Sequence, residues 1–382
     1  MLQEAIDAEV ADYIERHAET RASDSGRRAV VRNGHLPERE ILSSLGPIPV
    51  KQPRVRDSRA GMKFTSAILP PYLRKAPSLE ALIPTLYLTG VSTNDFPEAL
   101  AAILGEGAKG LSAGTIVRLK ESWEQEYQEW LKRDLTGKRY VYFWADGVYF
   151  NVRLSDERPC VLVIVGALAD GTKELVALVD GERESALSWK ELLLDLKRRG
   201  LATGPEISVG DGALGFWAAL DEVFPLSRRQ RCWVHKTANV LDKMPKSLQA
   251  AAKAMLHRMY LAATKAEALR VYADFLALYA AKCPKACACL EKDKEDLFAF
   301  YDFPAEHWGH LRTTNPVEST FGTVRHRHRQ TKGCGSRTTT LTMAHQLLLQ
   351  AEKHWRKLNR YELVLKVISG VKYVDGVELQ AA

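Results

Sequence analysis

The run RYVYFWADGVYFNVRL, residues 139–154, decides how the middle of this 382-residue chain folds. Its aromatic and β-branched residues favour a strand, but the pair Asp146-Gly147 lies inside it. Asp-Gly is common in tight hairpin turns, so a turn here would split the run into two strands. The segment LSDERP just downstream offers a better turn. If the run is one strand, Asp146 is a carboxylate among aromatic side chains, which is costly unless a metal or a cation balances it.

The segments after this run alternate between strand and helix patterns. CVLVIVGALA and ELVALVDG predict two more strands, and the patterns of helix, strand, helix and strand follow as far as RRQRCWVHK. This order predicts a mixed α/β sheet. Residues 246–300 are rich in Ala, Lys and Leu and predict an all-helical segment, which would be an insertion in the sheet region.

The residues before the sheet divide into two regions. Residues 1–70 predict an N-terminal helix followed by a basic segment rich in Pro and Gly, and residues 71–135 predict short helices. Gly-containing turns between these helices match a helix-turn-helix, whose third helix would begin in a DNA major groove, although an ordinary helical bundle also fits. The sheet would occupy residues 136–245 and 301–355, with residues 356–382 as a C-terminal tail.

Composition limits the classes of function. The net charge of +7 and the pI of about 9.0 suit a polyanionic partner. No apolar run reaches the roughly 18 residues that span a bilayer, and the acidic N-terminus is no secretory signal. Six cysteines are few for this length and indicate a reduced intracellular protein. We therefore expect a cytoplasmic, nucleoid-associated protein with no membrane partner.

A second Asp-Gly pair lies in SVGDGALGFW, residues 208–217. Asp211 follows an apolar strand and precedes a helix, so it could be a simple N-cap. It also stands at the carboxyl end of a strand, where α/β sheets bind their ligands. Gly210 and Gly212 would leave room for a substrate backbone beside it.

A third acid, Glu318, lies in RTTNPVESTFGTVRHRHRQTKG, residues 312–333. Asn315, Pro316 and Glu318 fit the N-cap, first and third positions of a helix, which is nearly a capping box. The alternative is that this helix directs Glu318 toward Asp146 and Asp211. Three such carboxylates would bind two divalent cations, which can clamp the attacking and leaving oxygens of a phosphoryl transfer.

Other polar residues lie near these acids in the sequence. Cys232 and His235 could form half of a zinc site, but we favour a role in bracing the acids or contacting DNA phosphate. The basic runs RRQR and RHRHRQTK favour phosphate contacts, although a charge run is often only a solvated face. The predicted DNA-binding residues are Arg228, Arg229, Arg231, Arg325, Arg327, Arg329 and Lys332. The predicted supporting or DNA-contacting residues are Cys232, His235 and Asn315.

Four segments together resemble the mutator-type transposases of bacterial insertion sequences: WADGVYF, VGDGALGFW, CWVHKTANVLDKMPK and TTNPVESTFGTVRHRHRQTKG. The resemblance implies a ribonuclease-H-like core with a DDE triad, Asp146, Asp211 and Glu318, and an all-helical insertion before the glutamate. It implies metal-dependent DNA cleavage and strand transfer with Mg²⁺, or Mn²⁺ as a substitute. The implied partners are the element's terminal inverted repeats, target DNA and further copies of the chain in a homo-oligomer, at least a dimer.

Two other functions stay open. A non-catalytic repressor of the same element would bind DNA without cutting it, and the triad argues against this. A ribonuclease-H-like nuclease would hydrolyse RNA or branched DNA without joining strands, and the extent of the resemblance argues against that.

Overall fold

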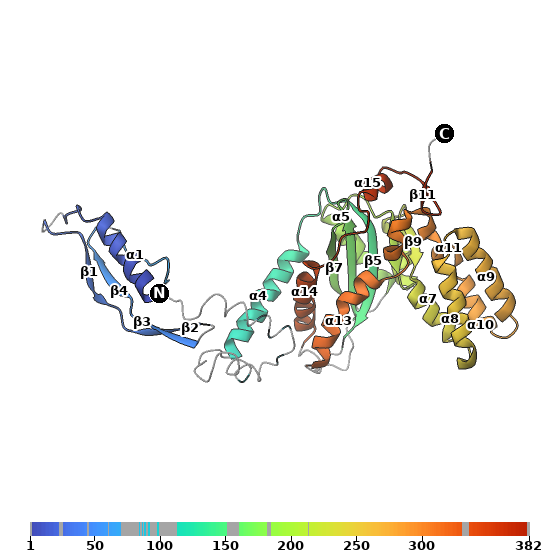
Figure 1. The fold of residues 1–382 in the computed structure, drawn as a ribbon, viewed down its shortest axis with the longest axis horizontal. Coiled ribbons are helices and arrows are strands. Elements are labelled where there is room, and N and C mark those ends of the chain that lie inside the picture. Colours follow the sequence, from blue (N-terminus) through green and yellow to red (C-terminus); the bar gives the residue numbers. More distant parts are fainter. Residues whose placement is uncertain are drawn as a thin grey trace. The chain divides into compact units, whose positions relative to one another are not determined.

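A computed structural model describes residues 2–22, 26–43, 46–59, 61–69, 113–150, 160–181, 185–212, 214–330 and 336–379, and a few single positions between 84 and 98. The chain divides into two compact units, Met1–Leu119 and Lys120–Ala382 (Figure 1). Each unit has its own hydrophobic core. Most of the predicted helix-turn-helix, residues 71–112, lies outside the described residues.

The first unit packs one helix against short antiparallel strand pairs. Helix α1 (Leu2–Arg16) is followed by the pair β1 (Val30–His35) and β4 (Pro53–Asp57), and by the pair β2 (Arg39–Ser43) and β3 (Gly46–Val50). Its small core contains Ile6, Ile41, Val50 and Leu69. The predicted N-terminal helix is present, and the basic segment after it forms these two strand pairs.

The second unit is built around a five-stranded sheet in the order β7-β6-β5-β8-β9. Its strands are β5 (Tyr140–Tyr149), β6 (Cys160–Leu168), β7 (Lys173–Gly181), β8 (Ile207–Gly210) and β9 (Arg228–Arg231). Strand β6 runs antiparallel to β5 and β7, whereas β8 is parallel to β5 and β9 is parallel to β8. The predicted mixed α/β sheet is therefore confirmed.

The Asp-Gly pair in the opening run does not form a turn. Strand β5 continues through Asp146 and Gly147, and Asp146 lies opposite Val163 of β6. The turn between β6 and β7 instead uses Asp170 and Gly171, where Gly171 has a φ of 77°. Asp146 is therefore a carboxylate in the central strand of the sheet, the costly alternative that the sequence left open.

The two faces of the sheet carry different partners. Helices α5 (Ala186–Arg198) and α6 (Leu214–Val223) pack on the face that bears Phe143 and Ala145, where they form the main core. Because side chains alternate along a strand, Tyr142, Trp144 and Asp146 point to the opposite face. There the indole of Trp144 donates to the carbonyl of His310, 2.8 Å away. Helices α13 (Asn315–Gln330) and α14 (Arg337–Glu352) also contact this part of the unit.

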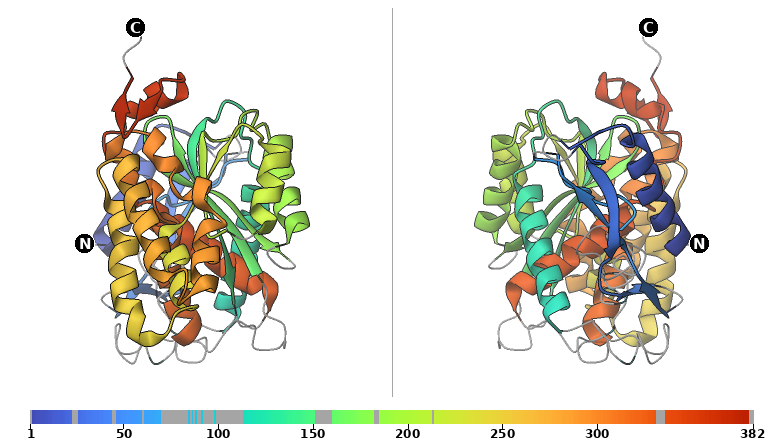
Figure 2. Two further views of the ribbon diagram at one scale, coloured as in Figure 1. Left: turned by 90° about the vertical axis from the view of Figure 1, so that its right-hand side faces the viewer. Right: turned by 90° about the vertical axis from the view of Figure 1, so that its left-hand side faces the viewer.

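Helices fill the chain between β9 and α13. They are α7 (Trp233–Leu241), α8 (Lys246–Leu261), α9 (Lys265–Tyr279), α10 (Pro284–Glu291) and α11 (Lys294–Leu297), followed by η1 (Ala299–Asp302), η2 (Ala305–His307) and α12 (Trp308–Leu311). Residues 246–300 are thus helical, as their composition predicts. Figure 2 shows α8 and α9, in yellow, on one side of the sheet and α5 and α6, in green, on the other.

Two further elements complete the description. Helix α4 (Ala113–Leu131) precedes the sheet, and its Tyr127 hydroxyl donates to the carbonyl of Leu178 in β7. After α14 come α15 (Leu363–Ile368) and the small hairpin β10 (Tyr373–Val374) and β11 (Val377–Glu378). None of the helices in the described ranges is both long and apolar enough to cross a membrane.

Candidate active site

Asp146 and Asp211 lie at the same edge of the sheet. Strands β5 and β8 are parallel neighbours, and their register pairs Trp144 with Val209. Asp146 lies two residues beyond Trp144 in β5, and Asp211 directly follows the end of β8, so the two aspartates come from neighbouring strands, which are spaced about 4.8 Å apart. Asp146 is only 7% exposed, whereas Asp211 is half-buried. The register therefore places the two predicted aspartates side by side.

The charge of Asp146 is influenced by the other predicted acids. Burial raises the pKa of Asp146 to about 7, and the negative charges of Asp211 and Glu318 contribute to the increase. The nearby His235 acts in the opposite direction. The carboxylates of Asp211, at the end of β8, and of Glu318, in α13, are therefore close enough to act on the charge of Asp146 in β5.

Glu318 is held in an arrangement that differs from the predicted capping box. The amides of Val317 and Glu318 donate to the carbonyl of Thr314, so Thr314, not Asn315, is the N-cap of α13. Glu318 is then the fourth residue of the helix and cannot complete a capping box. Its carboxylate instead accepts a hydrogen bond from the Thr314 hydroxyl. The predicted position of Asn315 is therefore wrong, and its side chain is exposed.

Cys232 and His235 support this arrangement from the start of α7. The thiol of Cys232 is fully buried; its sulfur accepts a hydrogen bond from the Thr314 amide at 3.4 Å and lies 3.3 Å from the Thr314 hydroxyl oxygen. His235 Nδ1 lies 3.6 Å from the Glu318 carboxylate. A hydrogen bond with Cys232, aided by the charges of Glu318 and Asp146, raises the pKa of His235 to about 9. His235 is thus positively charged at neutral pH beside the acids.

The closest group of metal-ligand atoms in the described chain is not the predicted triad. Cys232, His235 and Glu318 offer ligand atoms that all lie within 4.8 Å of one another. Sulfur and nitrogen ligands suit zinc, but here the Thr314 amide donates to the Cys232 sulfur, and His235 Nδ1 lies 3.6 Å from the Glu318 carboxylate as an ion pair. A hard divalent cation prefers carboxylate oxygens, which Asp146, Asp211 and Glu318 supply. Those three are therefore the residues that could hold such a metal.

The glycines on both sides of Asp211 have a packing role. Gly212 has a φ of 89°, and a Cβ atom there would lie 2.2 Å from Nε of Arg231. A Cβ atom on Gly210 would lie 3.1 Å from the Trp217 ring. The space that the sequence suggested for a substrate backbone is filled by these two side chains.

The basic strand β9 is mostly engaged within the protein. Arg231 is 3% exposed and donates to Asp293 at 3.1 Å, and the same carboxylate lies 2.5 Å from the buried Lys236 amine. This buried ion pair replaces the DNA contact predicted for Arg231. Arg228 and Arg229 are nearer the surface, where they pair with Asp302 and Asp221.

The basic run of α13 is divided between the surface and the interior. Arg325 and Arg329 are exposed, seven and eleven residues after Glu318, so they continue the face of the helix that bears it. Arg327 is 2% exposed, which contradicts its predicted contact with DNA. The predicted DNA-binding residue Lys332 lies outside the described residues. Arg325 and Arg329 are therefore the residues of this run best placed for the predicted DNA contact, which stays a prediction.

Thr314 is the residue that sequence analysis missed. Its amide and hydroxyl bridge Cys232 and Glu318, which are far apart in sequence. A signal was present, because a Thr directly before Asn-Pro is itself a good N-cap.

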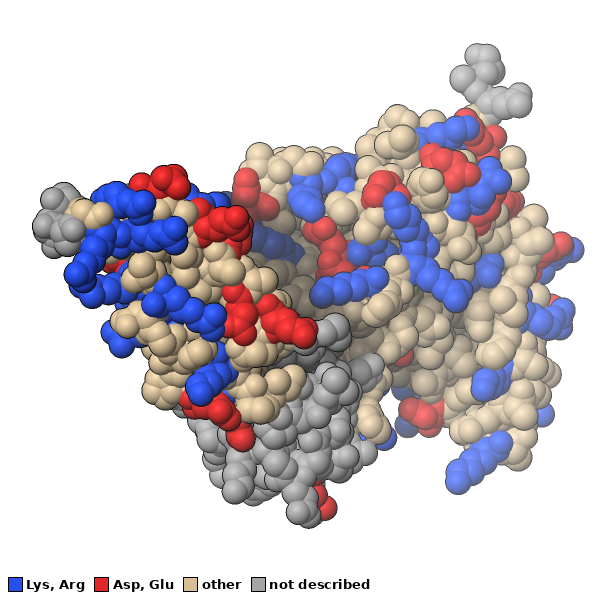
Figure 3. All heavy atoms as spheres, turned by 60° about the vertical axis from the view of Figure 1, so that its left-hand side comes forward, with Lys and Arg blue, Asp and Glu red and all other residues tan. Residues whose placement is uncertain are grey.

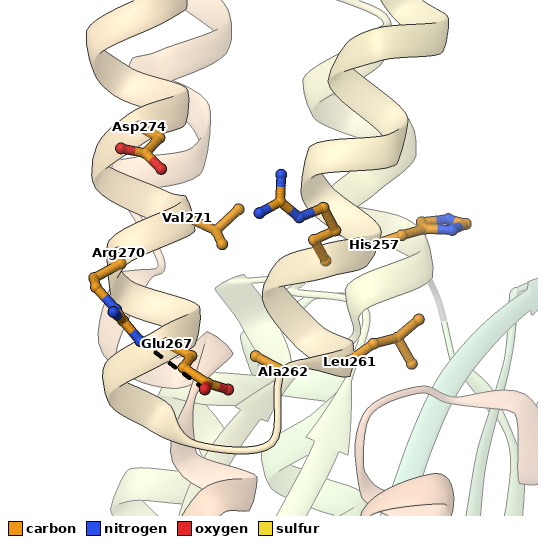
Figure 4. Close-up of a pocket in the computed structure, with 8 residues that line it drawn as sticks. His257, Leu261, Ala262, Glu267, Arg270, Val271 and Asp274 are labelled. Atoms are coloured by element: carbon orange, nitrogen blue, oxygen red, sulfur yellow. Dashed lines mark ion pairs between the residues drawn. The ribbon is translucent and has the colours of Figure 1, made fainter.

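A cavity of about 590 Å³ lies between α8 and α9 (Figure 4). Its lining includes Arg258, Leu261 and Asp274, and an ion pair between Glu267 and Arg270 at 3.9 Å. None of the predicted site residues lines it, so it is separate from the carboxylate cluster.

Known proteins resemble this chain over most of its length. The family described as Transposase, Mutator family, matches residues 1–357. The transposase for insertion sequence element IST2 of Acidithiobacillus ferrooxidans is 50% identical over 287 residues, 73% of this chain and 95% of that protein. The transposase for IS6120 of Mycolicibacterium smegmatis is 50% identical over 298 residues, 78% of this chain and 92% of that protein. The transposase for IS256 in Tn4001 of Staphylococcus aureus is 28% identical over 331 residues, 85% and 82% of the two chains.

Proposed function

Because the chain belongs to the Mutator family of transposases, we propose that it is a DDE-type DNA transposase with a ribonuclease-H-like core. The observation that carries the proposal is the buried carboxylate of Asp146, whose pKa is raised first by burial and then by the neighbouring charges of Asp211 and Glu318. A buried carboxylate kept beside two others is costly, and a cation-binding role explains why it is retained. A mixed sheet in which only β6 runs against the other strands supports the proposed core.

The proposed cofactor is Mg²⁺, with Mn²⁺ as a substitute, held by Asp146, Asp211 and Glu318. Their oxygen donors fit such ions, and a bound cation would relieve the repulsion among them. When bound, a metal pair supplies stabilisation to the attacking and leaving oxygens of a phosphodiester.

The remaining residues of the site orient the acids and the DNA. Thr314 and His235 fix the Glu318 carboxylate through a hydrogen bond and a positive charge. Arg325 and Arg329 would contact phosphates along the exposed face of α13. The proposed reaction frees a 3′-hydroxyl at an end of the element by hydrolysis. That hydroxyl then attacks a phosphodiester of the target, so that it becomes joined to the target's 5′-phosphate while the target's own 3′-hydroxyl leaves. The proposed partners are terminal inverted repeats, target DNA and a second copy of the chain.

Strand transfer by the purified protein tests this proposal. Labelled DNA with the element's terminal repeats, in Mg²⁺ or Mn²⁺, should give joined products. We expect Asp146→Asn, Asp211→Asn and Glu318→Gln each to reduce joining by at least about 100-fold, because each removes charge from the reacting centre. DNA binding should persist in all three variants.

Asp170→Asn is the matched control, because Asp170 belongs to an Asp-Gly pair in an exposed turn. This variant should join DNA as the wild type does. Binding by the wild type without cleavage would instead identify a repressor, and cleavage without joining would identify a nuclease. Either result contradicts the proposal.

A further inference from the structure

The first unit separates its charges between its helix and its strands. Helix α1 carries one cation, Arg16, and five acids: Glu4, Asp7, Glu9, Asp12 and Glu15. Residues 26–59 carry three acids, Glu38, Glu40 and Asp57, and eight cations: Arg27, Arg28, Arg32, Arg39, Lys51, Arg54, Arg56 and Arg59. In Figure 3 the Lys and Arg side chains of this unit gather on one side. The strands therefore form a basic surface.

Some of these arginines balance acids within the unit. Arg32 lies 3.0 Å from Asp7 of α1, and Arg59 lies 2.6 Å from Asp57. Four others, Arg27, Arg28, Arg54 and Arg56, are exposed and form no ion pair with any residue in the described part of the chain. Their charges are available to a partner.

The β1–β4 pair places two of these charges on one face. Arg54 and Arg56 are two residues apart on β4, so they point the same way, about 6.7 Å apart. Pro53, the first residue of β4, is buried, and Asp57, the last, accepts a hydrogen bond from Arg59. Arg56 lies opposite the apolar Val31 of β1, and no acid lies between the two arginines. The outer face of β4 therefore carries two arginines and no acid.

We propose that Arg54 and Arg56, which we call the arginine face, grip the phosphates of duplex DNA, and that the exposed Arg27 and Arg28 of the same unit add positive charge. That the polyanion is DNA rests on the proposed function. Guanidinium groups bind phosphate through paired hydrogen bonds, and a two-stranded antiparallel ribbon is of a size that fits the major groove. Phosphate contacts add affinity for any sequence, so this face holds DNA rather than reading it.

DNA binding by two double variants of the full-length protein tests the inference. Arg54→Ala/Arg56→Ala removes two charges from the arginine face. Arg16→Ala/Arg32→Ala is the matched control, because it removes two exposed charges of the same unit that are paired with acids. Fluorescence anisotropy would follow binding in EDTA to two duplexes, one with the terminal repeats and one scrambled, between about 50 and 200 mM salt.

We expect the first variant to bind both duplexes about tenfold more weakly at low salt. The slope of log K against log salt should also fall by about 2, one for each lost phosphate contact. The control should match the wild type. Circular dichroism would check the fold, and Arg54→Gln/Arg56→Gln would replace the alanine pair if that pair unfolds.

An unchanged slope would overturn the inference, and so would a loss confined to the repeat duplex, which would indicate base reading. Binding to phosphatidylglycerol vesicles would be measured in parallel. If the first variant lost binding to the vesicles alone, the arginine face would be assigned to a membrane. The assay needs no metal and no catalysis. A failure of strand transfer therefore leaves this inference standing, and its own failure leaves the proposed chemistry standing.

Discussion

At the scale of single residues, the site depends on how one carboxylate is restrained. Glu318 reaches from α13 and is oriented by the Thr314 hydroxyl and by the charged ring of His235. The backbone amide of the same threonine donates to Cys232, so a single residue joins the start of α7 to the start of α13. Thr314 is therefore a positioning residue that acts through Glu318.

Replacing Thr314 separates positioning from stability. Thr314→Val removes a buried hydroxyl, and we expect it to cost about 1–2 kcal/mol of unfolding free energy. It should slow strand transfer at least about tenfold, because Glu318 is no longer fixed. Thr314→Ser should restore the rate. The measurements are single-turnover strand transfer and urea unfolding.

Thr264→Val provides the control for Thr314. Thr264 caps α9 by accepting from the Glu267 amide at 3.2 Å, so its loss should cost about 1 kcal/mol without slowing strand transfer. If both variants slow the reaction equally, Thr314 acts only through stability.

At the scale of elements, strand β9 shows that the arginines of one basic run can have different surroundings. Arg231 lies inside against Asp293, which is also the partner of Lys236, whereas Arg229 remains partly exposed beside Asp221. Two cations share one carboxylate in the buried group. Its purpose is to join β9 to the start of α11, not to bind DNA.

The two arginines should differ in unfolding experiments. Arg231→Ala leaves a buried group of charges incomplete and should cost about 2–4 kcal/mol. Arg229→Ala breaks a surface pair and should cost at most about 1 kcal/mol. Urea unfolding of both variants measures the difference. If the Arg231→Ala protein were stable but bound DNA weakly, the predicted DNA contact of Arg231 would be supported instead.

At the scale of the whole molecule, the two units have separate cores and different proposed roles. The second contains the carboxylate cluster, and the first contains the arginine face. The first unit is small, and its core of a few aliphatic residues is supplemented by a polar group. In that group Asp57 accepts from Arg59 and from the Tyr13 hydroxyl at 2.8 Å.

Two thermal transitions should be seen by calorimetry, and Asp57→Asn should shift only that of the first unit. Hydrogen bonds from Arg59 hold the pKa of Asp57 well below its usual range. A lowered carboxylate pKa stabilises the fold above the ordinary value of about 3.9, and that stability is lost as the pH falls below it. We expect a loss of roughly 1–2 kcal/mol at pH 7 that shrinks below about pH 4.

Asp12→Asn is the control for Asp57, because Asp12 pairs with Arg16 on the exposed side of α1. It should change stability by less than about 0.5 kcal/mol at either pH. A shift of both transitions by Asp57→Asn would show that the units unfold together.

The sequence by itself determined the sheet, the helical insertion and the family. Strand and helix periodicities are local, so apolar runs such as residues 160–168 predict their own conformation. The family follows from motifs that surround Asp146, Asp211 and Glu318, and these motifs are short and contiguous.

Only the tertiary structure decided which of several local possibilities each residue adopts. Asp146-Gly147 could be a turn, and neighbours on β6 and β8 make it part of a strand. In the sequence Arg231 cannot be told from a surface cation, but in the structure it donates a hydrogen bond to Asp293, 62 residues away, in the interior. Thr314 and Cys232 are 82 residues apart. Burial and pairing depend on such distant partners, whereas a local pattern contains only the residue's own neighbours.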